Sequence, residues 1–190
     1  MQKILIAITF LVFLLSGCGD PIMPKPRGYF RVDFPEKEYR SFDSVGFPYR
    51  FMYPVYGRVI DDDSRIKERF WVNVDFPNHK ARIHISYKPA KGRLDSLLED
   101  SRTLAYKHAL KAESINEMFF SNPDAKVYGL LYSIKGNAAS SWQFYVTDSV
   151  NHFLRGALYF AVSPNKDSLA PSVDFFGKDL IELVETIEWK

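Results

Sequence analysis

The sequence is short of cysteine, of charge of one sign and of long hydrophobic runs. Cys18 is the single cysteine among 190 residues, so no disulfide can form within the chain and the fold must depend on packing and hydrogen bonding. The 25 basic side chains are nearly balanced by 23 acidic ones, which gives no electrostatic support for a nucleic-acid partner. A chain of this length suits a single core, so we expect one domain.

Motifs that carry catalytic or metal chemistry are also missing. The chain has no Gly-x-Ser-x-Gly turn for a nucleophile and no glycine-rich phosphate loop. Its four histidines, His79, His84, His108 and His152, lack the His-Glu-x-x-His spacing of a metal site. We therefore expect no catalytic residues, no metal and no cofactor, and we predict that the protein is not an enzyme.

The hydrophobic run near the N-terminus, from Ile4 to Leu15, is too short for a transmembrane helix, which needs about 20 apolar residues. It follows Lys3 and leads into the segment 15–18 (LSGC), a pattern typical of a bacterial lipoprotein signal peptide. We expect removal of residues 1–17 and acylation of the Cys18 thiol. More than one acyl chain on this residue would anchor the protein stably in a bilayer.

Residues 18–28 contain three prolines, which favour an extended tether between lipid and domain. Position 19 is glycine and not aspartate, so the inner-membrane retention signal of enteric bacteria is absent. We expect the protein to face the periplasm from the inner leaflet of the outer membrane, with the lipid bilayer as a partner. Residues 29–190 are predicted to form the single domain.

Alternating apolar and polar residues predict strands, and helical spacing predicts two helices. The predicted strands cover residues 29–34, 49–53, 70–76, 83–87, 127–134, 141–147 and 153–160. One helix is expected over residues 94–111. A second is expected to begin at the cap Ser172, after a loop that ends at Pro171, and to run to about Ile187. The charged segment 61–69 is expected to be an exposed loop.

Strands dominate both halves of the chain, and each half ends in one helix. We therefore predict an α+β fold, a single domain in which an antiparallel sheet is covered on one face by both helices. The order of the elements resembles the Mog1/PsbP-like α/β sandwich.

Part of the predicted helix 94–111 offers a candidate surface for a protein partner. Arg102, Tyr106 and Lys107 lie away from its apolar side, and tyrosine and arginine are enriched where proteins meet. The turn at Asn137 is a further candidate. An ordinary solvated helix face explains the same residues about as well.

The tripeptide Asp-Ser-aliphatic recurs four times, with its serines at Ser44, Ser96, Ser149 and Ser168. It resembles the O-glycosylation sequon of Bacteroidetes periplasmic proteins. Because aspartate and serine are also common at helix caps and turns, the tripeptide has a purely structural interpretation as well.

Several long segments together carry a family resemblance. They are PKPRGYFRVDFP (24–35), LEDSRTLAYKH (98–108), KVYG (126–129), IKGNAAS (134–140), FLRGALYF (153–160) and PNKDSLAP (164–171). In this order they resemble the gliding-motility lipoprotein GldD family of Bacteroidetes. The resemblance implies a membrane-anchored, non-enzymatic accessory of gliding motility and type IX secretion that contacts other envelope proteins. Cys18 is the one functional position that it assigns.

From these observations we expect a lipid-anchored assembly module. A periplasmic protein that binds a lipid or glycan fragment in a pocket is the alternative, and an unrecognised hydrolase is a third possibility that the missing motifs disfavour.

Overall fold

The computed structural model describes residues 31–63 and 68–190. The described residues belong to one compact unit, Arg31–Lys190. Cys18, the predicted signal peptide, the predicted tether and the first two residues of the predicted strand 29–34 lie outside the described residues. Their assignments stay predictions.

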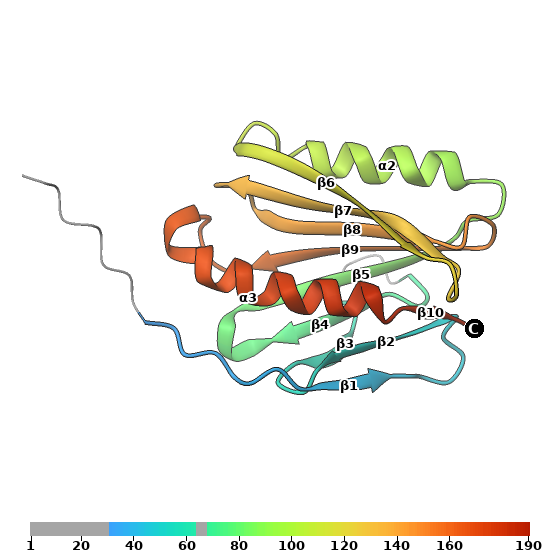
Figure 1. The fold of residues 1–190 in the computed structure, drawn as a ribbon, viewed down its shortest axis with the longest axis horizontal. Coiled ribbons are helices and arrows are strands. Elements are labelled where there is room, and N and C mark those ends of the chain that lie inside the picture. Colours follow the sequence, from blue (N-terminus) through green and yellow to red (C-terminus); the bar gives the residue numbers. More distant parts are fainter. Residues whose placement is uncertain (1–30, 64–67) are drawn as a thin grey trace, which may run out of the picture. The chain divides into compact units, whose positions relative to one another are not determined.

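A seven-stranded antiparallel sheet, in the order β3-β4-β5-β9-β8-β7-β6, forms the centre of the domain (Figure 1). Its strands are β3 (Arg58–Asp61), β4 (Val72–Phe76), β5 (Ala81–Pro89), β6 (Ala112–Asn122), β7 (Val127–Gly136), β8 (Ser140–Thr147) and β9 (His152–Phe160). A smaller antiparallel sheet has the order β1-β2-β10, with β1 (Tyr39–Phe42), β2 (Tyr49–Pro54) and β10 (Glu188–Trp189). The helices are α2 (Leu94–Tyr106), α3 (Lys166–Glu185) and the short 3-10 helix η1 (Pro77–His79). The predicted α+β class is confirmed.

The β4–β5 hairpin shows why alternation predicts these strands well. Val74 pairs with Ile83 and both are fully buried, whereas the next pair, Asn73 and His84, points to the other face of the sheet. The turn closes at Lys80, which takes a left-handed conformation with φ of 50°. The predicted hairpin is confirmed. So is the meander of β7, β8 and β9.

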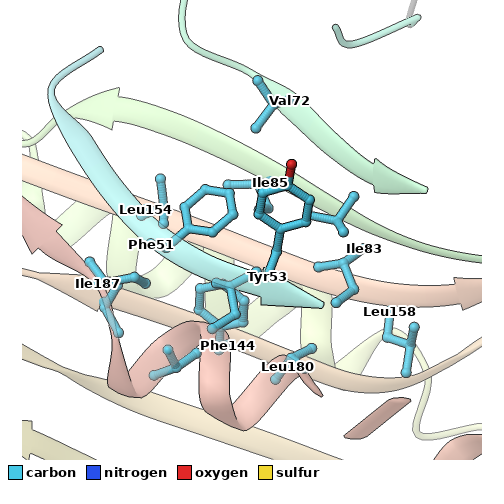
Figure 2. Packing of buried hydrophobic residues seen from close by; sticks show 14 of the residues in the cluster. Phe51, Tyr53, Val72, Ile83, Ile85, Phe144, Leu154, Leu158, Leu180 and Ile187 are labelled. Atoms are coloured by element: carbon cyan, nitrogen blue, oxygen red, sulfur yellow. The ribbon is translucent and has the colours of Figure 1, made fainter. Parts of the chain in front are cut away.

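The small sheet and α3 pack against the same face of the large sheet. Figure 2 shows this hydrophobic layer, in which Phe51 of β2 and Leu180 of α3 meet Ile83 and Leu154 of the large sheet. Each of these side chains is at most 1% exposed, and burying one of this size contributes about 1.5–3 kcal/mol. The layer therefore binds the first and last parts of the chain to its middle.

The expectation that both helices cover one face of the sheet is wrong. Phe144 of β8 belongs to the core beneath α3, whereas its neighbour Tyr145 packs with Phe153 of β9 and Leu97 of α2. Because successive side chains of a strand point to opposite faces, α2 and α3 lie on opposite faces of the large sheet. The sheet is thus the middle layer.

Helix boundaries also differ from the expected ones. Helix α2 ends at Tyr106, and the chain then turns into β6, a strand that was not predicted because residues 112–122 show no regular alternation of apolar and polar side chains. Helix α3 begins at Lys166 and not after Ser172. The side chain of Asn165 caps it by accepting a hydrogen bond from the Ser168 backbone N–H at 3.0 Å. Pro171 is the sixth residue of the helix, where its missing N–H removes one backbone hydrogen bond.

The short strands β1, β3 and β10 were not predicted either, because two to four residues are too few to show an alternating pattern. Residues 31–34 are not a strand, and the first strand is β1. The predicted loop 61–69 begins inside β3, at Asp61, and Asp63 in that loop accepts a hydrogen bond from Arg82 at 2.8 Å. β10 is a two-residue strand that pairs with β2.

A buried carboxylate on α3 ties the layers together. Asp179 is fully buried and accepts hydrogen bonds from Lys37 Nζ at 2.6 Å, Tyr39 OH at 3.0 Å and Tyr56 OH at 2.7 Å. Burial lowers the pKa of Lys37, an effect that Asp179 opposes, and burial and Asp179 both raise the pKa of Tyr56. This group, which we call the Asp179 cluster, holds the segments before β1 and after β2 against α3.

We predict that Asp179→Asn destabilises the domain by about 3 kcal/mol, because Lys37 loses its counter-ion while it stays partly buried. Urea unfolding followed by circular dichroism measures this change. Asp174→Asn is the matched control on the same helix. Asp174 pairs with Lys178 in solvent, so its loss should change the free energy of unfolding by less than about 0.5 kcal/mol. Equal effects of the two substitutions would contradict the role given to the Asp179 cluster.

Candidate functional site

Two of the candidate docking residues come together with a strand that the sequence did not reveal. The guanidinium of Arg102 lies 5.2 Å from the ring centroid of Tyr106, and the Tyr106 hydroxyl donates a hydrogen bond to Glu117 of β6 at 3.0 Å. This bond to Glu117 raises the pKa of Tyr106. Glu117 was missed because nothing in its neighbourhood predicted a strand there.

Strand β6 is the edge of the large sheet. It is 11 residues long and, among the described residues, pairs only with β7, so its other side presents backbone groups that no described strand pairs. Phe119, which points to the same face as Glu117, has 89% of its surface exposed, and Met118 beside it is 39% exposed. A long open edge is a template for pairing with another chain, and Phe119 adds an apolar side chain to it. We define Arg102, Tyr106, Glu117 and Phe119 as the α2–β6 surface.

Soluble proteins usually protect an open edge with lysine, proline or a short strand. The opposite edge, β3, follows this rule: it has four residues, and Arg58 lies on it in an ion pair with Asp75 at 2.9 Å. β6 contains no lysine, arginine or proline. Its two glutamates are engaged, Glu117 with Tyr106 and Glu113 with Lys166. The two edge strands of the sheet therefore differ: β3 is short and has an arginine, whereas β6 is long and has no lysine, arginine or proline.

Lys107 and Asn137 occupy other positions. Lys107 is exposed directly after α2. Asn137 is exposed in the β7–β8 turn, where its Oδ1 accepts a hydrogen bond from the Lys166 backbone N–H at 2.9 Å and its own N–H donates to Lys111. Asn137 thus holds the start of α3. A docking role for either residue stays a prediction.

The four candidate glycosylation serines are placed in turns and first helical turns. Ser96 lies in the first turn of α2 and Ser168 in that of α3, while Ser149 and Ser44 lie in turns. Ser44 is partly buried and the other three are exposed. Before Ser149, Asp148 accepts three backbone hydrogen bonds, which explains its tripeptide structurally. Modification of the serines stays a prediction.

The histidines are spread over the domain. His79 contacts Phe34 and Phe176, His84 contacts Tyr159, and His152 stacks on Trp189. Over residues 31–63 and 68–190, no three acidic, histidine or cysteine side chains gather as metal ligands. No helix in that part of the chain has the length and apolarity needed to cross a bilayer.

An open groove of about 720 Å³ lies where the end of β2, the β6–β7 turn and the end of α3 meet. Its lining mixes Met52 with the charged side chains of Asp124, Glu185 and Glu188. Arg50 also lines it and is already bound to Glu188 at 2.5 Å. A lipid chain needs a mostly apolar lining, so this groove does not suit one.

Comparison with known proteins decides the family. The family model described as gliding motility lipoprotein GldD matches residues 19–189. The chain belongs to the GldD family. Its relatives are named as lipoproteins of gliding motility, so a membrane-anchored protein of that process is the indicated class. No curated protein matches the chain.

One similar solved structure is that of cyanobacterial PsbP (CyanoP) from Synechocystis sp. PCC 6803. It has a TM-score of 0.49 and 10% sequence identity, and the match covers 93% of this GldD-family chain and 99% of that chain. At this identity the likeness concerns the fold alone.

We predict that Phe119→Ala changes the free energy of unfolding by less than about 0.5 kcal/mol, because the side chain is almost fully exposed. The matched control is Phe153→Ala in the layer beneath α2. Phe153 is 3% exposed, so its truncation should cost about 3 kcal/mol. Chemical unfolding of the purified protein measures both. A large loss of stability for Phe119→Ala would show that this phenylalanine serves the fold.

Proposed function

We propose that this GldD-family protein is a periplasm-facing lipoprotein that acts as a non-enzymatic assembly component of the gliding-motility and type IX secretion machinery. Its lipid anchor is the acylated Cys18, in the inner leaflet of the outer membrane. Its partner is another envelope protein of that machinery, which it contacts through the α2–β6 surface.

The observation that carries this proposal is the long edge strand β6, which has no lysine, arginine or proline and presents the exposed Phe119. A free-standing protein gains nothing from such an edge, and its exposure favours aggregation. A partner that covers the edge would pair with its backbone groups and bury the phenylalanine. Arg102 and Tyr106, residue types enriched at the centres of interfaces, lie beside it.

The lipid anchor supports the same function. Acyl chains on Cys18 would confine the domain to one bilayer surface, which raises its effective concentration for partners in the same membrane. A modest contact through the α2–β6 surface is then enough for stable assembly. The absence of catalytic motifs from the sequence agrees with a role in assembly.

We predict that radiolabelled palmitate labels the wild-type protein in cells and does not label Cys18→Ala, because the thiol is the site of acylation. Gel autoradiography of the immunoprecipitated protein measures this. Ser44→Ala, elsewhere in the chain, serves as the control and should be labelled like the wild type. An unlabelled wild-type protein would overturn the anchor.

We further predict that the double charge reversal Arg102→Glu with Lys107→Glu weakens association with the partner about tenfold, equivalent to about 1.4 kcal/mol. Colony spreading and in-cell crosslinking yield should fall, while the unfolding midpoint of the purified protein stays unchanged.

The matched control is Lys91→Glu with Arg93→Glu. It makes the same change in net charge on exposed residues just before α2. Normal spreading in the Arg102 and Lys107 variant, or equal loss in both double variants, would remove the α2–β6 surface together with the adjoining Lys107 as the docking site.

A further inference from the structure

A positively charged side chain without a counter-ion lies on the face of the large sheet that α2 covers. This is Arg155 of β9, which is partly buried. It pairs with Tyr145 of β8 and therefore points to the same face of the sheet as that tyrosine. Among the described residues, its guanidinium has one hydrogen bond, from Nη2 to Gln143 Oε1 at 2.6 Å. Arginine carries five N–H donors. Within the described part of the chain, no carboxylate lies within ion-pair distance of Arg155.

The other arginines of this face are neutralised. Arg58 and Arg82 both contact the carboxylate of Asp75, at 2.9 Å and 3.1 Å, and Arg82 also binds Asp63. Arg155 is more enclosed than Arg58 and lies nearer the middle of the sheet, yet it has no such partner. Its lack of a carboxylate is therefore a local feature and not a property of the whole face.

Two further polar groups on this side of the sheet lack a partner among the described residues. The side-chain oxygen of Gln143 accepts the hydrogen bond from Arg155. The Nε2 of the same amide is buried and has no acceptor among the described residues. Ser101, on the inner side of α2, is 2% exposed, and its hydroxyl has no partner either. Such groups in a protein interior call for a bound water or a ligand.

Among the described residues, the titratable groups that act on this guanidinium or on its neighbours are mainly histidines and tyrosines. His108, just after α2, lies close enough for the charge of Arg155 to act on it. Burial and that charge both lower the pKa of His108, and burial lowers the pKa of Arg155. Tyr132 of β7 and Tyr159 of β9 lie near the guanidinium, and His84 of β5 contacts Tyr159. Glu117 acts on Tyr132 and is itself bound to Tyr106. The cluster is therefore rich in donors and poor in negative charge.

We propose that Arg155, held in place by Gln143, is a binding site for a compact oxyanion, either a carboxylate or a phosphate group. The planar fork of a guanidinium binds two oxygens of such a group at once. The bound anion supplies the missing negative charge and, by offsetting the charge of Arg155, favours the protonated form of His108. This site is separate from the α2–β6 surface and goes beyond the docking function.

The test follows the His108 ring by NMR in the full mature, acylated protein, labelled with carbon-13 at its histidines and held in phosphatidylcholine nanodiscs. His108→Gln assigns the signal. Inorganic phosphate and acetate are titrated at constant ionic strength, with chloride as the control for screening. We expect a saturable rise in the pKa of His108 by about one unit, because an anion that binds tenfold more tightly to the protonated form shifts the pKa by that amount.

A second arm identifies the source of the oxyanion. Nanodiscs that contain phosphatidic acid replace the soluble anions. A shift with inorganic phosphate or acetate indicates a small soluble ligand, whereas a shift with phosphatidic acid alone indicates a lipid headgroup. If His108 responds to none of them beyond the chloride control, the proposal is overturned.

Variants separate the site from general charge effects. Arg155→Gln should abolish the shift, and Arg58→Gln, which removes an exposed arginine from the same face, should leave it unchanged. Should Arg155→Gln fail to fold, Arg155→Lys keeps the charge but loses the fork, and it should weaken anion binding about tenfold. An unchanged anion response in both Arg155 variants would contradict the assignment.

Discussion

The buried carboxylate of Asp179 is the constraint on which the arrangement of layers depends. It is reached from one side by Lys37 and Tyr39 and from the other by Tyr56, so the chain before β1 and the chain after β2 are both held to α3. An unpaired buried charge is costly, which leaves these partners little freedom to separate. Phe34 extends the contact by stacking on Phe175, with 4.2 Å between ring centroids. The part of the domain that follows the predicted tether is therefore attached firmly to its closing helix.

The two faces of the large sheet serve different ends. One face is covered by α3 and the small sheet, and its packed hydrophobic side chains supply stability. The other is covered by α2 only in part and contains all four of the buried side-chain atoms that lack a partner among the described residues, in Asn73, Ser101 and Gln143. Buried polar groups without hydrogen-bond partners lower the stability of the fold, and a bound partner or ligand can satisfy them. The division agrees with a protein whose core holds it together while its other face and its β6 edge are available for binding.

Regular alternation allowed the sequence to predict the β4–β5 hairpin and the β7–β8–β9 meander, because buried residues such as Val74 and Ile83 repeat at every second position. β6 could not be predicted in this way. As an edge strand with two largely solvated faces it has no apolar period, and pairing with β7 alone creates it. The two helices were recognised as helices. Their placement on opposite faces depends on Phe144 and Tyr145 pointing to opposite sides of β8, which local periodicity does not relate to either helix.

By itself, the sequence determined the α+β class, the family resemblance and the expectation of a lipid anchor at Cys18, because each of these is written in consecutive residues. Only the tertiary structure decided which side chains lack partners and which edge is open. Arg155 and Gln143, like Tyr106 and Glu117, are neighbours through strand register and helix packing. Register and packing are set by the burial of the whole core, so the chemistry of these sites does not exist until the chain has folded.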